Sequence, residues 1–273
     1  MPLLRRRVVP AAKLNVPIIG HRSASQILSA FFGWHHYIAL WNMLRLYPDF
    51  AENLHRYLFD SGNYPYPIRV RTPAAGIVQP TLHSMHDLLT VNEVFCRHDY
   101  LADEKTRVVV DIGSNIGISA LYFLTRNSTC RCYLYEPDPR NLARLRTNLA
   151  AYGSRYALHP VAVANHSGMV DFGTEPSGRY GGIGLRLTES IQVQCVDINV
   201  VLAQVLHREE QIDILKIDTE GAELDIVQAI RRDYLERIQR IYFESPSQRR
   251  LYPDLFEQQK YGGVCRLIRR ENG

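Results

Sequence analysis

The sequence predicts an α/β protein with an open sheet, and three stretches lead to that prediction. Residues 108–112 favour a buried strand and run through two glycines into the apolar pattern of a helix at 118–124. Residues 132–135 form a second strand-like run, and residues 212–218 form a third that leads directly into another helical pattern. Open α/β sheets of this kind bind ligands in the crevice beyond the carboxyl ends of their strands.

Length and composition agree with one globular α/β domain, or with such a domain and a smaller N-terminal addition. The chain has 273 residues, of which 46% are hydrophobic and 22% are charged, so we do not expect disorder. Its net charge is +4, and arginines gather at residues 5–7, 249–250 and 266–270. Arginine clusters at chain ends without interleaved aromatics predict solvated tails, and we therefore expect no nucleic-acid partner.

Cysteine content and apolar patterning indicate the compartment. The five cysteines are an odd number without a zinc spacing, which predicts buried, reduced thiols in a cytoplasmic protein. The N-terminal stretch is broken by prolines and polar residues, so it lacks the apolar core of a signal peptide. Residues 26–47 are the most apolar region, but His35, His36, Asn42 and Arg45 interrupt it. We expect a buried or interfacial helix there and no transmembrane segment.

The first hundred residues predict short elements that precede the sheet. Residues 1–25 look like an extended arm, the helix at 26–47 is closed by Pro48, and a shorter amphipathic helix runs from 50 to 58. Prolines keep residues 65–73 extended, with a small hairpin or irregular lead-in near residues 76–80. Asp87 is expected to open a helix that ends near residue 100 and delivers the chain to the strand at 108.

The turn after that strand predicts an adenosine-binding site. Gly113 and Gly117 allow backbone angles that other residues adopt only at a cost, and free N–H groups at the following helix N-terminus face whatever binds there. Glu136 ends the next strand, 25 residues after Asp111. An acidic residue at about this distance (roughly 20 residues on) accepts hydrogen bonds from ribose hydroxyls in nucleotide-binding α/β folds.

The spacing of the glycines favours S-adenosylmethionine over a dinucleotide. A dinucleotide fingerprint needs a glycine where this chain has Asn115, which disfavours the rival hypothesis of an NAD-dependent oxidoreductase. The Asp111 carboxylate also points towards a cation and away from a phosphate. S-adenosylmethionine carries an amino group, a sulfonium and a ribose, and it has no phosphate.

The rest of the chain predicts further strands, each with a polar end. A helix begins at Asp138 and Pro139 and stops at Gly153, and a third strand spans 156–163, where Val163 is placed to cover an adenine ring. Short alternating runs follow between 168 and 196. The glycine-rich connection at 177–182 is either an acceptor-binding loop or an ordinary hairpin tip.

Two later strands end in carboxylates. Asp197 caps a helix, and the strand at 212–218 ends in Asp218, which faces the ligand-binding crevice. Glu220 and Glu223 follow, and the helix dipole explains Glu223. The strand at 238–243 likewise ends in Glu244.

Three motifs together resemble the FkbM family of S-adenosylmethionine-dependent methyltransferases: Val-Asp-Ile-Gly-Ser-Asn-Ile-Gly, Tyr-Glu-Pro-Asp, and Leu-Lys-Ile-Asp-Thr-Glu-Gly-Ala-Glu. The resemblance implies a class I Rossmann-like fold, a seven-stranded mostly parallel sheet with helices on both faces. The methyltransferase domain would occupy residues 81–273, and residues 1–80 would form an N-terminal arm and helical extension. The cofactor-binding residues that it implies are Asp111, Gly113, Ser114, Asn115, Gly117, Glu136, Pro137 and Val163.

The resemblance also implies O-methylation of a hydroxyl on a small molecule of the polyketide, sugar or glycolipid type, as in natural product biosynthesis. Asp218 and Glu244 would lie near the transferred methyl, and Glu220, Arg179 and Tyr180 would contact the acceptor. A hydroxyl is a weak nucleophile at neutral pH, so a base or Mg²⁺ must assist it. Asp218 with Glu244 and Glu220 is one candidate for either role, and the candidate histidine bases are His83, His86, His159 and His166.

One alternative from a different class stays open. A non-catalytic scaffold could keep the cofactor pocket and attach to a membrane surface through the arginine-rich arm and the helix at 26–47. The sequence leaves three roles open for the N-terminal helices, which could cover the active site, form a homodimer or touch a membrane.

Overall fold

A seven-stranded central sheet organises the fold. The computed structural model describes residues 18–19, 22–23, 34–175, 178, 181–245 and 249–270. The strand order is β16-β17-β15-β14-β7-β8-β9. All neighbours pair in parallel except β17, which is antiparallel to both β15 and β16. The strands are β7 Val108–Ile112, β8 Arg131–Tyr135, β9 Tyr156–His159, β14 Ile212–Ile217, β15 Ile238–Glu244, β16 Phe256–Tyr261 and β17 Val264–Arg269. The predicted seven-stranded, mostly parallel sheet is confirmed.

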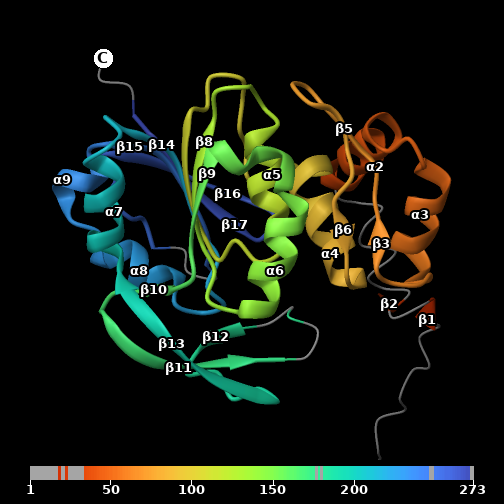
Figure 1. Ribbon diagram of the computed structural model, residues 1–273. Coiled ribbons are helices and arrows are strands. Elements are labelled where there is room, and N and C mark those ends of the chain that lie inside the picture. The colour runs from red at the N-terminus through yellow and green to blue at the C-terminus, as the bar shows by residue number, and fades with distance from the viewer. Residues whose placement is uncertain are drawn as a thin grey trace, which may run out of the picture.

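Helices cover both faces of this sheet (Figure 1). One face carries α5 (Ile118–Leu124) and α6 (Pro139–Asn148), and the other carries α7 (Ile198–Leu206), α8 (Glu223–Ala229) and α9 (Arg232–Leu235). Every residue of β7 is buried, and its side chains alternate between the two cores: Val109 packs with α5, whereas Val108 and Val110 pack with α7. This double burial explains why β7 reads as a continuous apolar run.

Helix boundaries follow the predicted caps with two exceptions. Asp138 and Asp197 cap α6 and α7 through hydrogen bonds to backbone N–H groups, as predicted. Helix α6 ends at Asn148, however, and the predicted stop Gly153 lies in a following 3₁₀ helix, η2 (Ala150–Arg155). Helix α4 (Met85–Val91) is capped by Ser84, and the predicted opener Asp87 is its third residue, in a capping box. It continues as a π-helix, η1 (Asn92–Cys96).

The N-terminal elements extend the core on the α5 side. They are the helices α2 (Trp34–Leu46) and α3 (Phe50–Phe59) and three antiparallel pairs: β1 (Ile18–Ile19) with β2 (Arg22–Ser23), β3 (Tyr66–Pro67) with β6 (Thr81–Leu82), and β4 (Val70–Thr72) with β5 (Gly76–Val78). Met43, Tyr47 and Leu82 belong to the same buried cluster as Tyr122 of α5. The domain boundary at residue 80 stays a prediction. One buried cluster contains residues from both sides of it. No helix within the described ranges is long and apolar enough to cross a membrane.

A second, four-stranded sheet lies below the central one in Figure 1. Its order is β10 (Ala162–Ala164), β13 (Glu189–Asp197), β11 (Gly168–Thr174) and β12 (Gly181–Ile183). The predicted single strand at 156–163 is wrong, since β9 stays in the central sheet while β10 pairs with β13. Pro160 separates them, and it cannot donate to a sheet ladder because it has no N–H group.

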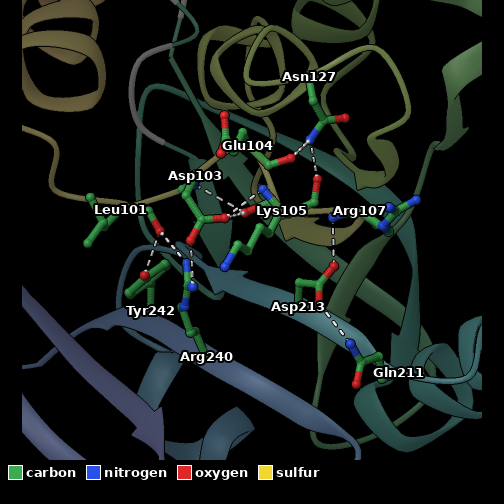
Figure 2. A network of polar contacts seen from close by, with 12 residues as sticks. Leu101, Asp103, Glu104, Lys105, Arg107, Asn127, Gln211, Asp213, Arg240 and Tyr242 are labelled. Carbon is green, nitrogen blue, oxygen red and sulfur yellow. Dashed lines mark hydrogen bonds and ion pairs between the residues drawn. The ribbon is translucent and has the colours of Figure 1, made fainter.

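A polar network fixes the loop at 101–107 that leads into β7 (Figure 2). The Asp213 carboxylate accepts hydrogen bonds from two backbone N–H groups at the start of β7, at 2.6 and 2.9 Å. The Tyr242 hydroxyl donates to the first carbonyl of the loop at 2.7 Å, and Arg240 pairs with a loop carboxylate at 3.0 Å. These contacts anchor the loop to β14 and β15, and they thereby place Tyr100, the residue before it.

Candidate active site

The turn between β7 and α5 requires both predicted glycines. Gly113 has a φ of 77°, and a Cβ there would collide with the backbone oxygen of Asp218 at the end of β14. Gly117 has a φ of 86°, and a Cβ there would lie 3.1 Å from the Leu145 side chain of α6. Gly113 therefore lets two strand ends approach each other, while Gly117 lets two helices pack closely.

A cavity opens beyond the carboxyl ends of β7 and β8. Its wall contains five of the residues predicted to bind the cofactor, namely Gly113, Asn115, Glu136, Pro137 and Val163. It also contains Asp218 and Glu220. The first cavity thus brings together residues that are more than 100 positions apart in the sequence.

Glu136 is the central polar group of the first cavity. It is buried, and its two carboxylate oxygens accept hydrogen bonds from the backbone N–H groups of Asn115 and Asp138, each at 2.9 Å. Burial raises the pKa of Glu136 to about 7, although these two N–H groups oppose the shift. Each carboxylate oxygen can accept a further hydrogen bond, so the group suits a pair of ribose hydroxyls.

Other atoms of the first cavity also fit adenosine. Asn141 Oδ1 and Thr219 Oγ1 are buried and have no hydrogen-bond partner among the described residues. Unpartnered buried polar atoms in a cavity wall indicate groups that a ligand satisfies. Val163, Phe172 and Ile183 supply an apolar surface for a flat ring. All three come from the second sheet, and sequence reasoning missed the last two. The cavity thus matches S-adenosylmethionine.

Asp111 lies beneath the site and does not line the first cavity. It is fully buried; its Oδ1 pairs with Lys216 Nζ at 3.0 Å, and its Oδ2 accepts a hydrogen bond from Ser119 at 2.6 Å. The cation towards which Asp111 points is therefore Lys216. The structure gives no support to a direct contact between Asp111 and the cofactor's amino group.

Lys216 is the residue that sequence reasoning overlooked. Only 2% of its side chain is exposed, and its ammonium also donates to the Gly113 carbonyl at 3.1 Å and pairs with Asp218 at 3.4 Å. Burial lowers the pKa of Lys216, but the carboxylates of Asp111 and Asp218 outweigh burial and raise it. The available signal was a lysine in the buried, apolar second half of a strand, directly beside Asp111 in the sheet register.

A second cavity adjoins the first and shares part of its wall. Both are lined by Gly113, Asn115, Asp218 and Glu220. The second cavity extends to α4 and η1 and has a markedly acidic lining. Its remaining carboxylates are Asp87, Glu93, Asp99 and Glu244.

Two acidic groups of the second cavity have raised pKa values. Burial raises the pKa of Glu93 to about 7, although Arg97 opposes the shift. Burial and the nearby Asp218 raise the pKa of Glu244. A carboxyl group with a pKa near neutrality, such as Glu93, is suited to accept a proton at physiological pH. Glu93 was not among the catalytic residues predicted from sequence.

The other predicted residues are distributed as follows. Ser114 lines the second cavity, and its hydroxyl donates to the Asp111 carbonyl at 2.8 Å. Glu223 accepts hydrogen bonds from backbone N–H groups before α8, which agrees with the predicted dipole role. Of the four candidate histidine bases, only His86 lines either cavity. Arg179 and Tyr180 lie outside the described residues.

The arrangement of carboxylates does not favour a metal site. In the part of the chain that the structure describes, no group of three or more His, Cys, Asp or Glu side chains converges in a way that could hold a metal ion. The Mg²⁺ option therefore gains no support. The described cysteines are all buried free thiols, as expected.

The fold is that of a class I methyltransferase, and the first cavity lies at the point where the strand order reverses between β7 and β14. The model of the methyltransferase FkbM domain matches residues 111–261, more than half of the chain. The protein belongs to the FkbM methyltransferase family, and its class of activity is S-adenosylmethionine-dependent methyl transfer.

Curated relatives agree with this assignment. The chain is similar to the 2-O-methyltransferase NoeI of Sinorhizobium fredii, with 28% identity over 198 residues, which cover 66% of this chain and 76% of NoeI. It also resembles part of the AMB antimetabolite synthetase AmbE of Pseudomonas aeruginosa, with 22% identity over 62% of this chain but only 10% of AmbE.

Similarity to solved structures is weaker. M. capricolum TrmK in complex with S-adenosyl-homocysteine matches with a TM-score of 0.35 and 11% identity over 67% of this chain and 68% of that chain. A likeness at this level adds nothing to the functional assignment.

Proposed function

We propose that this protein transfers a methyl group from S-adenosylmethionine to a hydroxyl oxygen of a small-molecule acceptor. The observation that supports this most is the pair of adjoining cavities with the shared wall of Gly113, Asn115, Asp218 and Glu220. A methyl donor in the first cavity and an acceptor in the second would meet beside Asp218. The name of NoeI, a 2-O-methyltransferase, agrees with oxygen as the acceptor atom.

Within the first cavity, the protein binds and orients the cofactor. Bound S-adenosylmethionine supplies a methyl carbon that is electrophilic because it is attached to a sulfonium. Glu136 accepts hydrogen bonds from the ribose hydroxyls, and Asn141 Oδ1 accepts from an N–H group of the base. Val163 covers the adenine ring. Such positioning accounts for most of the rate acceleration in a displacement of this type.

Two carboxylates act on the acceptor hydroxyl, Asp218 from the shared wall and Glu244 from the second cavity. The Asp218 carboxylate is held 3.4 Å from the Lys216 ammonium, and it accepts a hydrogen bond from the hydroxyl and orients its oxygen. Glu244, whose pKa is raised, would take the proton that leaves the hydroxyl as the methyl carbon bonds to oxygen and its bond to the sulfonium sulfur breaks, which leaves a neutral thioether. A non-catalytic scaffold would have no use for carboxylates at this position, which favours the enzyme.

Asp218→Asn and Glu244→Gln test these roles, with Glu104→Gln as a control because Glu104 is exposed and lines neither cavity. Methyl transfer is measured with isotopically labelled S-adenosylmethionine and an acceptor found by screening hydroxylated glycosides and polyketides. We expect turnover to fall by about 10²-fold or more in both variants, with S-adenosylhomocysteine affinity almost unchanged. Equal losses of affinity and turnover in Asp218→Asn would assign that residue to the cofactor or the fold.

Several expectations remain predictions: a cytoplasmic location, the absence of a nucleic-acid partner and homodimer formation through the N-terminal helices. Roles of Arg179 and Tyr180 in acceptor binding also remain predictions.

A further inference from the structure

The second cavity has a large excess of acidic groups. Among the described residues that line it are six carboxylates but a single lysine or arginine, Lys216, and that ammonium is shared with the buried Asp111. Asp87 is occupied by its capping box, and Asp99 pairs with Arg97. The excess therefore falls on the groups that surround the open part of the cavity.

Glu93 and Glu244 carry part of this excess charge. Glu93 pairs with Arg97 at 3.4 Å but shares that cation with Asp99, and Glu244 makes no ion pair with any residue that the structure describes. Both line the second cavity and neither lines the first. Burial and neighbouring carboxylates raise the pKa values of both groups, although Arg97 opposes the shift at Glu93 and Lys216 opposes it at Glu244.

Tyr100 provides an independent sign of a ligand. Only 7% of this residue is exposed, it lines the second cavity, and its hydroxyl makes no hydrogen bond with the described part of the chain. Its ring instead contacts Lys216 and Tyr242, with Lys216 Nζ 5.4 Å from the ring centroid. A tyrosine buried to this degree normally has a hydrogen-bond partner, so the free hydroxyl is available to a bound molecule.

The geometry favours an organic cation over a metal ion. The described carboxylates do not converge as a metal-binding group, so they suit a molecule that carries several separated N–H and O–H donors.

We infer that the acceptor carries a protonated amino group in addition to the hydroxyl that is methylated. This inference rests on the methyl-transfer function proposed above. The ammonium lies among Glu93, Glu244 and the Tyr100 hydroxyl, and the neighbouring hydroxyl is presented at Asp218. Acceptors that carry a carboxylate or phosphate are repelled from the same cavity.

Three matched probes test the inference: 6-amino-6-deoxyglucose, glucose and glucuronic acid, which differ only at carbon six. Each is titrated calorimetrically at pH 7.5 into the full chain, with and without bound S-adenosylhomocysteine. We expect the amine to bind at least ten-fold more tightly than glucose and glucuronate to bind most weakly. High salt should reduce this preference, because it screens partly exposed charges.

Two variants localise the effect. Glu93→Gln combined with Glu244→Gln should abolish the preference for the amine, whereas Glu104→Gln should retain it. Tyr100→Phe should weaken the amine probe while S-adenosylhomocysteine still binds.

The inference is overturned if the wild-type protein binds amine and glucose equally, binds no amine probe, or keeps its preference in the double variant. Failure to bind S-adenosylhomocysteine would instead overturn the proposed function, and the probe titrations without cofactor would still report on the cavity.

Discussion

Replacing Lys216 by methionine would remove the only cation that contacts Asp111 within the described chain. The ammonium lies 3.0 Å from Asp111 Oδ1, and both side chains are at most 2% exposed. At an effective dielectric constant of about 20, unit charges at this distance attract by about 5 kcal/mol, part of which offsets the cost of burying them. After the substitution Asp111 keeps only the hydrogen bond from Ser119.

We expect Lys216→Met to lower the free energy of unfolding by about 3–5 kcal/mol, because it leaves a buried carboxylate without its counter-ion. Asp111→Asn should cost less, since Lys216 would still contact Asp218 and the Gly113 carbonyl. The double variant should recover part of the loss. Urea denaturation followed by circular dichroism gives all three values and the coupling energy between the two sites.

A result below about 1 kcal/mol for Lys216→Met would refute this reasoning. It would mean that the pair behaves like an exposed ion pair and that water reaches Asp111. Purely additive effects of Lys216→Met and Asp111→Asn would also contradict it.

Three further results are expected. Gly113→Ala should lower the free energy of unfolding by about 3 kcal/mol or more and abolish S-adenosylhomocysteine binding, because the added Cβ meets the Asp218 backbone at a residue with positive φ. The control is Gly153→Ala, where the added Cβ has no atom within 4 Å. Its free energy of unfolding should stay within about 0.5 kcal/mol of wild type. Affinity for S-adenosylhomocysteine should rise between pH 6 and 8, because Glu136 has a pKa of about 7 and its ionised carboxylate accepts hydrogen bonds from the ribose hydroxyls. In Glu136→Gln the affinity should no longer change with pH over this range. The same raised pKa means that Glu136 binds its proton more tightly in the folded chain than in the unfolded chain. The contribution of Glu136 to the free energy of unfolding should therefore decline as pH rises from about 4.5 to 7. Thermal unfolding of wild type and Glu136→Gln across this pH range measures the decline.

Much of the fold could be predicted because its signals are local. The apolar run of β7, the glycines of the following turn and the caps Asp138 and Asp197 act within a few residues of themselves. The division of residues 156–164 between two sheets was missed, because which sheet a short strand joins depends on partners far along the chain. The one local signal of a break between β9 and β10 was Pro160.

The same distinction holds at the site. Glu136 and Asp218 could be predicted because they stand at strand ends, where open sheets bind ligands. The role of Lys216 depends on its register beside Asp111, and the position of Glu93 depends on how η1 packs against α2 and α5. Neither packing relation can be read from the residues that surround them in the sequence.

The central claim is that the cavity beyond β7 and β8 binds S-adenosylmethionine through Glu136. Calorimetric titration with S-adenosylmethionine and S-adenosylhomocysteine, with NAD as the control ligand, tests it most directly. We predict saturable binding of the first two, no binding of NAD, and at least ten-fold weaker binding by a folded Glu136→Ala variant. Absence of binding by the folded wild-type protein, or full affinity in Glu136→Ala, would contradict the account.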